Sequence, residues 1–162
     1  MYGAVLFSGV LLFGAEKRGY AKKITILKEP YQTLFWVLND IFPPIKDKLD
    51  IKKINTIGFF MAIMDDKRVE DDEKIFIKKG IERLSASSIE LYKKQYISLN
   101  FLERDDILKT ISKENWGENW LWTLLKYTLE SLLCDPVYGG NIDQVGWKWL
   151  GHTTGHPRPK AL

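Results

Sequence analysis

Residues 115–132, NWGENWLWTLLKYTLESL, form the most apolar helix-like stretch of this 162-residue chain. Apolar side chains recur there every three or four residues, which places them along one face of an α-helix. They are Trp116, Trp120, Leu121, Leu124, Leu125, Leu129 and Leu132. Asn115 stands directly before them, where a capping residue is favoured. The stretch therefore predicts a long amphipathic helix that packs against a core.

Five stretches upstream have the same helical spacing of apolar residues: 30–42, 55–66, 70–84, 87–99 and 100–111. Pro43-Pro44 ends the first stretch, and Asn55 and Asn100 suit the capping positions of the second and the fifth. The fourth begins with the Ser87–Glu90 spacing of a capping box. Because no run alternates between apolar and polar residues as a strand would, we expect residues 28–134 to form a small all-α domain.

The segment after this domain has a different character: it reads Cys134-Asp135-Pro136-Val137-Tyr138-Gly139-Gly140-Asn141-Ile142-Asp143-Gln144-Val145-Gly146-Trp147-Lys148-Trp149-Leu150-Gly151. Its Gly-Gly-Asn run favours turns with positive φ, and Pro136 biases Asp135 away from helix. We expect residues 135–162 to form an irregular, non-helical loop and tail. Large aromatic residues on such a loop add little to the core of the domain, and they are typical of a docking surface or a ligand site.

The charge balance is nearly even, with 24 basic and 21 acidic residues and a formal net charge of +3. This balance does not indicate a nucleic-acid-binding protein. Cys134 is the only cysteine, so the chain has no internal disulfide and no cysteine-rich metal site. In an exported protein, an unpaired cysteine indicates an intermolecular disulfide or a free thiol. The alternative is a small buried side chain at the end of a helix.

Residues 3–15, GAVLFSGVLLFGA, are uncharged and mostly apolar. This run is shorter than the roughly 20 residues that span a bilayer, but it fits the apolar core of a secretory signal. Gly19-Tyr20-Ala21 has small residues at the spacing of a signal-peptidase site. We expect residues 1–21 to be a secretory signal ahead of a soluble chain. The alternative is an apolar N-terminal helix that docks on the domain.

The sequence contains only weak candidates for catalytic or metal-binding residues. Asp135 and Asp143 could act as an acid–base pair, but an Asp before Pro more often accepts backbone hydrogen bonds in a turn, and Asn141 has the same structural interpretation. His152 and His156 are the only histidines, and the Gly and Pro residues near them argue against a shared helical face for a metal. No glycine-rich nucleotide motif is present. We expect no catalytic, cofactor-binding or metal-binding residues on this chain.

The run Asp135-Pro136-Val137-Tyr138-Gly139-Gly140-Asn141, followed by Gly146-Trp147 and Leu150-Gly151, resembles the signature of the gluconate 2-dehydrogenase subunit 3 family. The resemblance extends upstream. Residues 33–43 are similar to an early helix of the family that ends in proline, and the helix over residues 116–132, which leads into Asp135-Pro136, also matches the family pattern. The resemblance therefore covers most of the chain.

The resemblance implies that this chain is the small subunit of a membrane-associated, FAD-dependent dehydrogenase. A large subunit would bind FAD and oxidise gluconate, glucose or a related polyol, and a multihaem cytochrome c subunit would pass the electrons to the membrane. The small subunit would carry no cofactor, and it would assist maturation and twin-arginine export of the large subunit. A periplasmic location and an indirect membrane association follow. No Arg-Arg pair precedes residues 3–15, which implies a start further upstream or another export route.

The resemblance and the aromatic loop together predict that the large subunit docks on the C-terminal segment. The predicted contact residues are Cys134, Asp135, Pro136, Tyr138, Gly139, Gly140, Asn141, Gly146, Trp147, Trp149 and Gly151. The three aromatic residues among them are of the kind that dominates interface energy. We expect Gly139-Gly140-Asn141 to let the backbone approach the partner closely, and Cys134 to form a disulfide with it in an oxidising compartment.

Two alternatives stay open. In the first, the chain is a carbohydrate-binding module whose Tyr138, Trp147 and Trp149 rings stack on sugars. In the second, it is an independent sugar-active enzyme that uses Asp135 or Asp143. Exposed parallel rings would favour the first alternative, and turnover by the isolated chain would favour the second.

Overall fold

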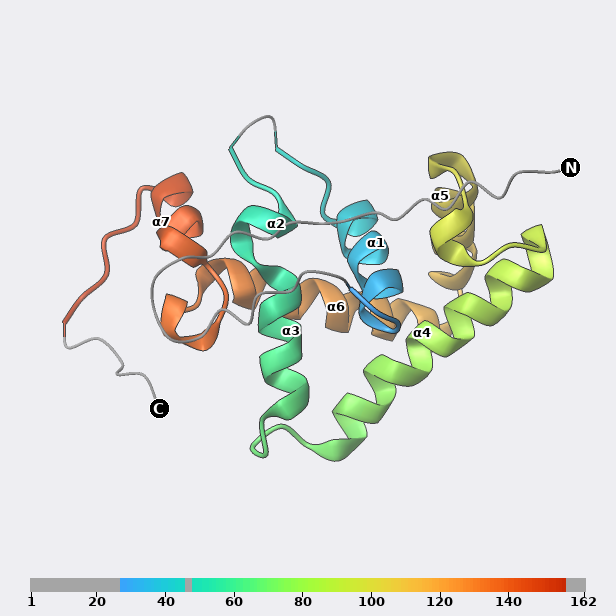
Figure 1. Cartoon of the computed structure of the whole chain (residues 1–162), viewed down its shortest axis with the longest axis horizontal. Helices are drawn as coiled ribbons and strands as arrows, with labels where there is room; N and C mark the ends of the chain where they lie inside the picture. The colour runs from blue at the N-terminus through green and yellow to red at the C-terminus, as the bar shows by residue number, and fades with distance from the viewer. Residues whose placement is uncertain (1–26, 46–47, 157–162) are drawn as a thin grey trace, which may run out of the picture.

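The computed structural model describes residues 27–45 and 48–156, and these residues form an all-α fold (Figure 1). Its α-helices are α1 (Tyr31–Ile41), α2 (Ile51–Ile54), α3 (Thr56–Asp65), α4 (Asp71–Tyr92), α5 (Phe101–Ile111), α6 (Asn115–Leu133) and α7 (Val145–Leu150). Three short 3-10 turns join them: η1 (Tyr96–Ser98), η2 (Pro136–Tyr138) and η3 (Ile142–Gln144). Within the described ranges the only β-type pairing is an isolated bridge between Ile45 and Leu49. The predicted fold class is confirmed.

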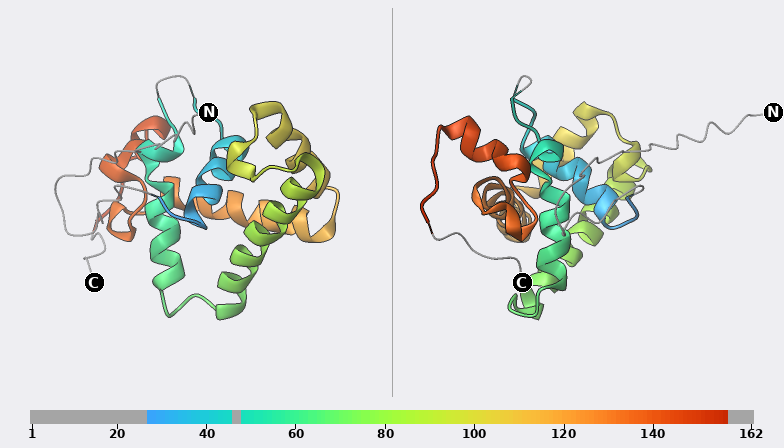
Figure 2. Two further views of the ribbon diagram at one scale, coloured as in Figure 1. Left: turned by 45° about the vertical axis from the view of Figure 1, so that its right-hand side comes forward. Right: turned by 60° about the vertical axis from the view of Figure 1, so that its left-hand side comes forward.

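Helix α6, which contains the stretch that predicted the fold, is the central element. It packs against α1, α2, α3, α4, α5 and α7. In Figure 1 it crosses behind α1, α3 and α4, with α5 near one end and α7 near the other. The right-hand view of Figure 2 shows α6 almost end-on, next to α3 and α7. The apolar face of α6 therefore supplies one side of the core along much of its length.

A close contact between α4 and α6 fixes the middle of the core. The Trp120 side chain of α6 is fully buried, and its indole N–H donates a hydrogen bond to the Ile77 carbonyl of α4 at 3.1 Å. The ring lies over Gly80, where an added Cβ would be only 2.1 Å from the indole nitrogen. The two helices can approach this closely because residue 80 has no side chain.

A buried ion pair joins α1 to α5. The Arg104 guanidinium donates to Asp40 at 2.7 Å and to the Leu99 carbonyl at 2.7 Å, and its Cζ atom lies 4.6 Å from the centre of the Trp36 ring. The Tyr96 hydroxyl donates to the same carboxylate at 2.9 Å. Burial, with the nearby Asp40 carboxylate, raises the pKa of Tyr96 above its ordinary value. A charge this deep in a protein needs such a complete set of partners.

Most predicted helix starts agree with the structure. Asn100 caps α5 in a capping box with Glu103, as its position predicted. Pro43 follows the end of α1, and the acidic residues near Glu70 lie at the start of α4. Asn115 is the first residue of α6, one position after the N-cap residue Glu114.

Two local predictions were wrong. Ser87 and Glu90 do not begin a new helix, because α4 continues through them to Tyr92, and Lys93 caps its end in the left-handed region at φ 55°. Asn55 does precede α3, but its side chain makes no capping hydrogen bond and its own φ is 65°. Its side chain instead donates a hydrogen bond to the Gly139 carbonyl, 84 positions further along the chain.

The N-terminal prediction concerns residues 1–21, which lie outside the described residues, so it stays a prediction. Among the helices that the structure does describe, none combines the length and the apolar character that a bilayer-spanning helix needs.

We expect Gly80→Ala to lower the free energy of unfolding by about 2 kcal/mol, because the methyl group would overpack the Trp120 ring by more than the gain in helix propensity. Urea titration followed by circular dichroism measures this change. Gly155→Ala is the control, since a Cβ at Gly155 meets nothing within 4 Å, and it should change stability by less than about 0.5 kcal/mol. Equal effects of the two substitutions would contradict the contact described.

Candidate functional site

The C-terminal segment, residues 134–151, folds back along the end of α6. The Asp135 carboxylate accepts a hydrogen bond from the Val137 backbone N–H at 3.0 Å and starts η2. Gly139 then turns the chain with φ 89°, a conformation that glycine adopts without steric cost. Asp135 thus has the structural turn role that its position before Pro136 suggested.

Asn141 holds this turn against α6. The residue is fully buried, with φ 47°. Its side-chain amide donates to the Cys134 carbonyl at 2.9 Å, and its side-chain oxygen accepts from the Gly146 N–H at 2.8 Å. One side chain therefore joins the end of α6 to the start of α7, which stabilises the return of the chain.

Helix α7 was not predicted, because we expected this segment to be non-helical. It buries Trp147, which is 6% exposed and donates its indole N–H to the Leu133 carbonyl at 2.8 Å. Gly151 ends α7 with φ 66°. A glycine after a short apolar run is a helix-termination signal, so the sequence did contain a sign of this helix.

The glycines of the segment allow close approach to α6 of the same chain. An added Cβ would lie 2.5 Å from the Ser131 carbonyl oxygen at Gly140 and 2.0 Å from the Leu132 carbonyl oxygen at Gly146. The Gly139-Gly140-Asn141 backbone was predicted to approach a partner closely. In the structure, Gly140 and Asn141 are buried against the chain itself.

A second asparagine connects the segment to α3. The Asn55 side-chain amide donates to the Gly139 carbonyl at 2.7 Å. Nearby, the hydroxyls of Thr56 and Ser131 lie 3.1 Å apart in a buried hydrogen bond between α3 and α6. Helices α3 and α6 and the turn η2 are therefore held together by polar contacts between backbone and short side chains.

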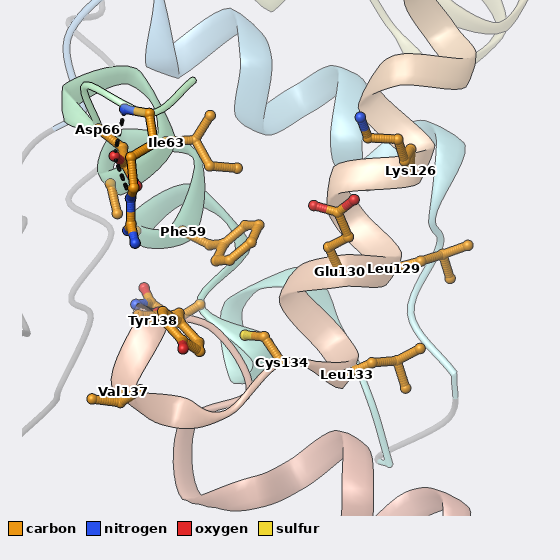
Figure 3. Close-up of a pocket in the computed structure, with 15 residues that line it drawn as sticks. Phe59, Ile63, Asp66, Lys126, Leu129, Glu130, Leu133, Cys134, Val137 and Tyr138 are labelled. Carbon is orange, nitrogen blue, oxygen red and sulfur yellow. Dashed lines mark hydrogen bonds and ion pairs between the residues drawn. The ribbon is translucent and has the colours of Figure 1, made fainter. Parts of the chain in front are cut away.

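These three elements enclose a groove of about 790 Å³ (Figure 3). Its lining is mainly apolar and includes Phe59, Ile63, Leu129, Leu133, Val137 and Tyr138. Leu129, Leu133 and Tyr138 are between 42% and 47% exposed. Large apolar side chains that stay this exposed around one hollow are typical of a surface that contacts another molecule.

Charged side chains stand around the groove. Arg68 pairs with Asp66 at 2.7 Å, and its hydrogen bonds lower the pKa of that carboxyl to about 2. Lys126 pairs with Glu73 of α4 at 3.2 Å. Glu130 makes no ion pair with any described residue, and Figure 3 shows its carboxylate directed into the space between Phe59 and Lys126. The groove therefore has one carboxylate that the described part of the chain does not neutralise.

Cys134 also lines the groove. It is half-buried, and its sulfur lies 3.6 Å from the Ser131 carbonyl. Burial raises the pKa of the thiol to about 11. Because the thiolate is the form that undergoes disulfide exchange, this environment disfavours reaction at neutral pH. The predicted disulfide with a partner stays a prediction.

Three of the predicted contact residues line the groove: Cys134, Tyr138 and Gly139. Trp149 is 41% exposed but lies outside the lining, as does Gly151 at the end of α7. The others, Asp135, Pro136, Gly140, Asn141, Gly146 and Trp147, are buried or partly buried within the chain.

The apolar residues that α3 and α6 contribute to the groove were not predicted. Leu129 and Leu133 are four residues apart on α6, and Phe59 and Ile63 have the same spacing on α3. Such pairs follow the pattern of core residues. No signal in the sequence separates the exposed Leu129 and Leu133 from the core residues beside them.

The comparisons with known proteins agree with the motif. The model of the family described as gluconate 2-dehydrogenase subunit 3 matches residues 29–155. This chain belongs to that family. The match covers α1 to α7, including the whole C-terminal segment. None of the curated proteins or solved structures compared with the chain matches it.

The two alternative functions receive no support from the site. A carbohydrate-binding platform needs Trp147 as an exposed ring, but this ring is buried and meets His152 edge to face, with the ring centres 6.0 Å apart. The Asp135 carboxylate caps η2, while Asp143 is exposed at φ 53°. Among the residues that the structure describes, no three His, Cys, Asp or Glu side chains are grouped as metal ligands.

We expect Asn141→Ala to lower the free energy of unfolding by about 3 kcal/mol, because it leaves the Cys134 carbonyl and the Gly146 N–H without their partner. Hydrogen exchange at the Gly146 amide should accelerate, and urea titration measures the global change. Asn119→Ala, on the exposed side of α6, is the matched control. An unchanged Gly146 exchange rate in Asn141→Ala would contradict the role assigned to Asn141.

The raised pKa of Cys134 predicts an unusual alkylation profile. The rate with iodoacetamide should still be rising at about pH 10, whereas an ordinary thiol, with a pKa near 9.0, approaches its plateau there. The sign follows from burial, which favours the neutral thiol. Cys134 is the only cysteine, so mass spectrometry of the intact chain follows it alone. A plateau by about pH 10 would show that the thiol is not buried as described.

Proposed function

We propose that this chain is the non-catalytic small subunit of a periplasmic, membrane-associated dehydrogenase of gluconate or a related sugar, and that it binds the large flavoprotein subunit through the groove. The observation that carries the proposal is the combination of family membership with an apolar groove of about 790 Å³ between α3, α6 and η2. A subunit that performs no chemistry acts through its surface, and the groove is a concave, mainly apolar surface on the described part of the chain.

The walls of the groove are suited to docking because they are fixed before a partner arrives. Asn55 joins η2 to α3, and Asn141 joins the end of α6 to α7. Binding then orders few additional residues, which reduces its entropic cost. Tyr138, Leu129 and Leu133 supply apolar area that a partner would bury, and buried Tyr side chains often dominate interface energy.

The remaining parts of the proposal follow from the family. FAD belongs to the large subunit and haem to a cytochrome c subunit. This chain contributes no group to either cofactor. It assists maturation of the flavoprotein and its export by the twin-arginine route, and the complex then contacts the membrane through the cytochrome.

A pull-down tests the proposal directly. The full chain with a C-terminal tag is purified from native membranes, and the absorbance spectrum of the eluate is recorded. We expect a large protein with flavin bands to co-purify. Deletion of the gene for this chain should also lower the amount of the flavoprotein in the periplasm. A colourless monomer, with normal flavoprotein export in the deletion strain, would refute the proposal.

Two substitutions test whether the groove is the docking surface. Leu129→Asp combined with Leu133→Asp places charges in the apolar wall and should weaken binding about 30-fold, which corresponds to about 2 kcal/mol. Phe101→Asp combined with Leu102→Asp is the matched control, because these residues are 63% and 73% exposed and lie on α5, outside the groove. Binding constants from titration of the purified large subunit give the comparison. Equal effects of the groove and control variants would place docking elsewhere.

A further inference from the structure

We propose that, in the free chain, the apolar N-terminal residues 3–15 occupy the groove as an internal placeholder. The occupancy is inferred from the groove and the sequence alone. Its consequence, that the segment competes with the large subunit, rests on the proposed function. The placeholder would keep Leu129, Leu133 and Tyr138 out of water until a partner replaces it.

The composition of the segment fits the lining of the groove. Residues 3–15 contain no charge, and the groove lining is mainly apolar. Leu6, Val10 and Phe13 have the i, i+4, i+7 spacing with which a helix inserts anchoring side chains into a hydrophobic groove. Ser8 and Ala15 would lie on the opposite face of such a helix. Transfer of these apolar residues from water is the driving force.

The attachment point and the reach of the chain also fit. The described chain begins at Leu27, which is buried in the same core cluster as Phe59 and Ile63, and both of those residues line the groove. Residues 16–26 connect the apolar run to this point. Fully extended, they span about 35–40 Å, whereas α3, which forms one wall, is about 15 Å long. The run can therefore reach any part of the groove.

Charge complementarity favours the same occupant. Lys17 and Arg18 follow the apolar run directly. Glu130 is the carboxylate of the groove that has no ion pair within the described ranges, since Asp66 is paired with Arg68. A docked run would place a cation within reach of Glu130. An exposed pair of this kind adds little energy, but it fixes the direction in which the segment lies.

Photo-crosslinking of the isolated full chain tests the occupancy. Benzoylphenylalanine is introduced in place of Tyr138, which lines the groove, and in a second variant in place of Trp122, which is exposed and lies outside it. We expect position 138 to link to residues 3–15 of the same chain and position 122 not to. Links from position 138 only to another copy, or to no residue of 3–15, would overturn the proposal. Mixing isotopically labelled and unlabelled chains separates intrachain from interchain links.

A matched pair of double variants completes the test. Val10→Asp with Phe13→Asp should reduce the position-138 link about tenfold and accelerate alkylation of Cys134 by a similar factor, which corresponds to about 1.4 kcal/mol. Ser8→Asp with Ala15→Asp adds the same charge on the opposite face and should leave both readouts unchanged. Equal effects of the two double variants would overturn the proposal. Because no partner is present, failure here is distinct from failure of the membrane pull-down.

Discussion

The contact between Gly80 and Trp120 is the constraint on which the other parts of the structure depend. Helix α6 packs against nearly every other helix, and its position relative to α4 is set where the indole ring lies over a residue without a side chain. The Trp120 hydrogen bond to Ile77 fixes the orientation of the ring as well as its depth. Since the far end of the same helix carries the groove and the C-terminal segment, a shift at Trp120 would move both.

The groove itself combines two kinds of interaction with separate tasks. Its frame is polar: Asn55, Asn141 and the Thr56–Ser131 pair hold backbone and short side chains in place. Its lining is apolar and makes few directional contacts within the chain. The polar contacts therefore fix the walls of the groove, and the apolar side chains of the lining stay available to contact another molecule. This division explains how a stable domain keeps Leu129 and Leu133 exposed without losing its own core.

The helices could be predicted from the sequence because their signals are local. Apolar spacing, the capping residue Asn100 and the helix-ending Pro43 depend on neighbours within a few positions, and they gave the fold class correctly. The predicted break at Ser87 failed because a capping pattern also occurs inside a long helix, where continued packing outweighs it. The role of Asn55 could not be predicted, because its partner at Gly139 is 84 positions away in the chain.

The candidate site was predicted only in part, for a related reason. The aromatic and glycine content drew attention to residues 134–151, and Tyr138 of this segment lines the groove. The exposure of each ring, however, depends on where the segment folds back. Trp147 is buried because Asn141 returns the chain to the end of α6, and no sequence rule for single residues distinguishes it from Trp149. The groove residues of α3 and α6 could not be identified from the sequence, because outward-facing leucines have the same spacing as core leucines.

The motif by which the family is identified thus has a consequence for partner choice. In Asp135-Pro136-Val137-Tyr138-Gly139-Gly140-Asn141, most residues cap a turn, adopt a left-handed conformation or press against α6. These residues specify how the turn folds against α6. Under the proposed function, discrimination between one flavoprotein and another would be encoded outside the motif, in exposed wall positions such as Leu129 and Leu133. Exchanging those wall residues between two members of the family would be expected to exchange their partners, while the motif stayed as it is.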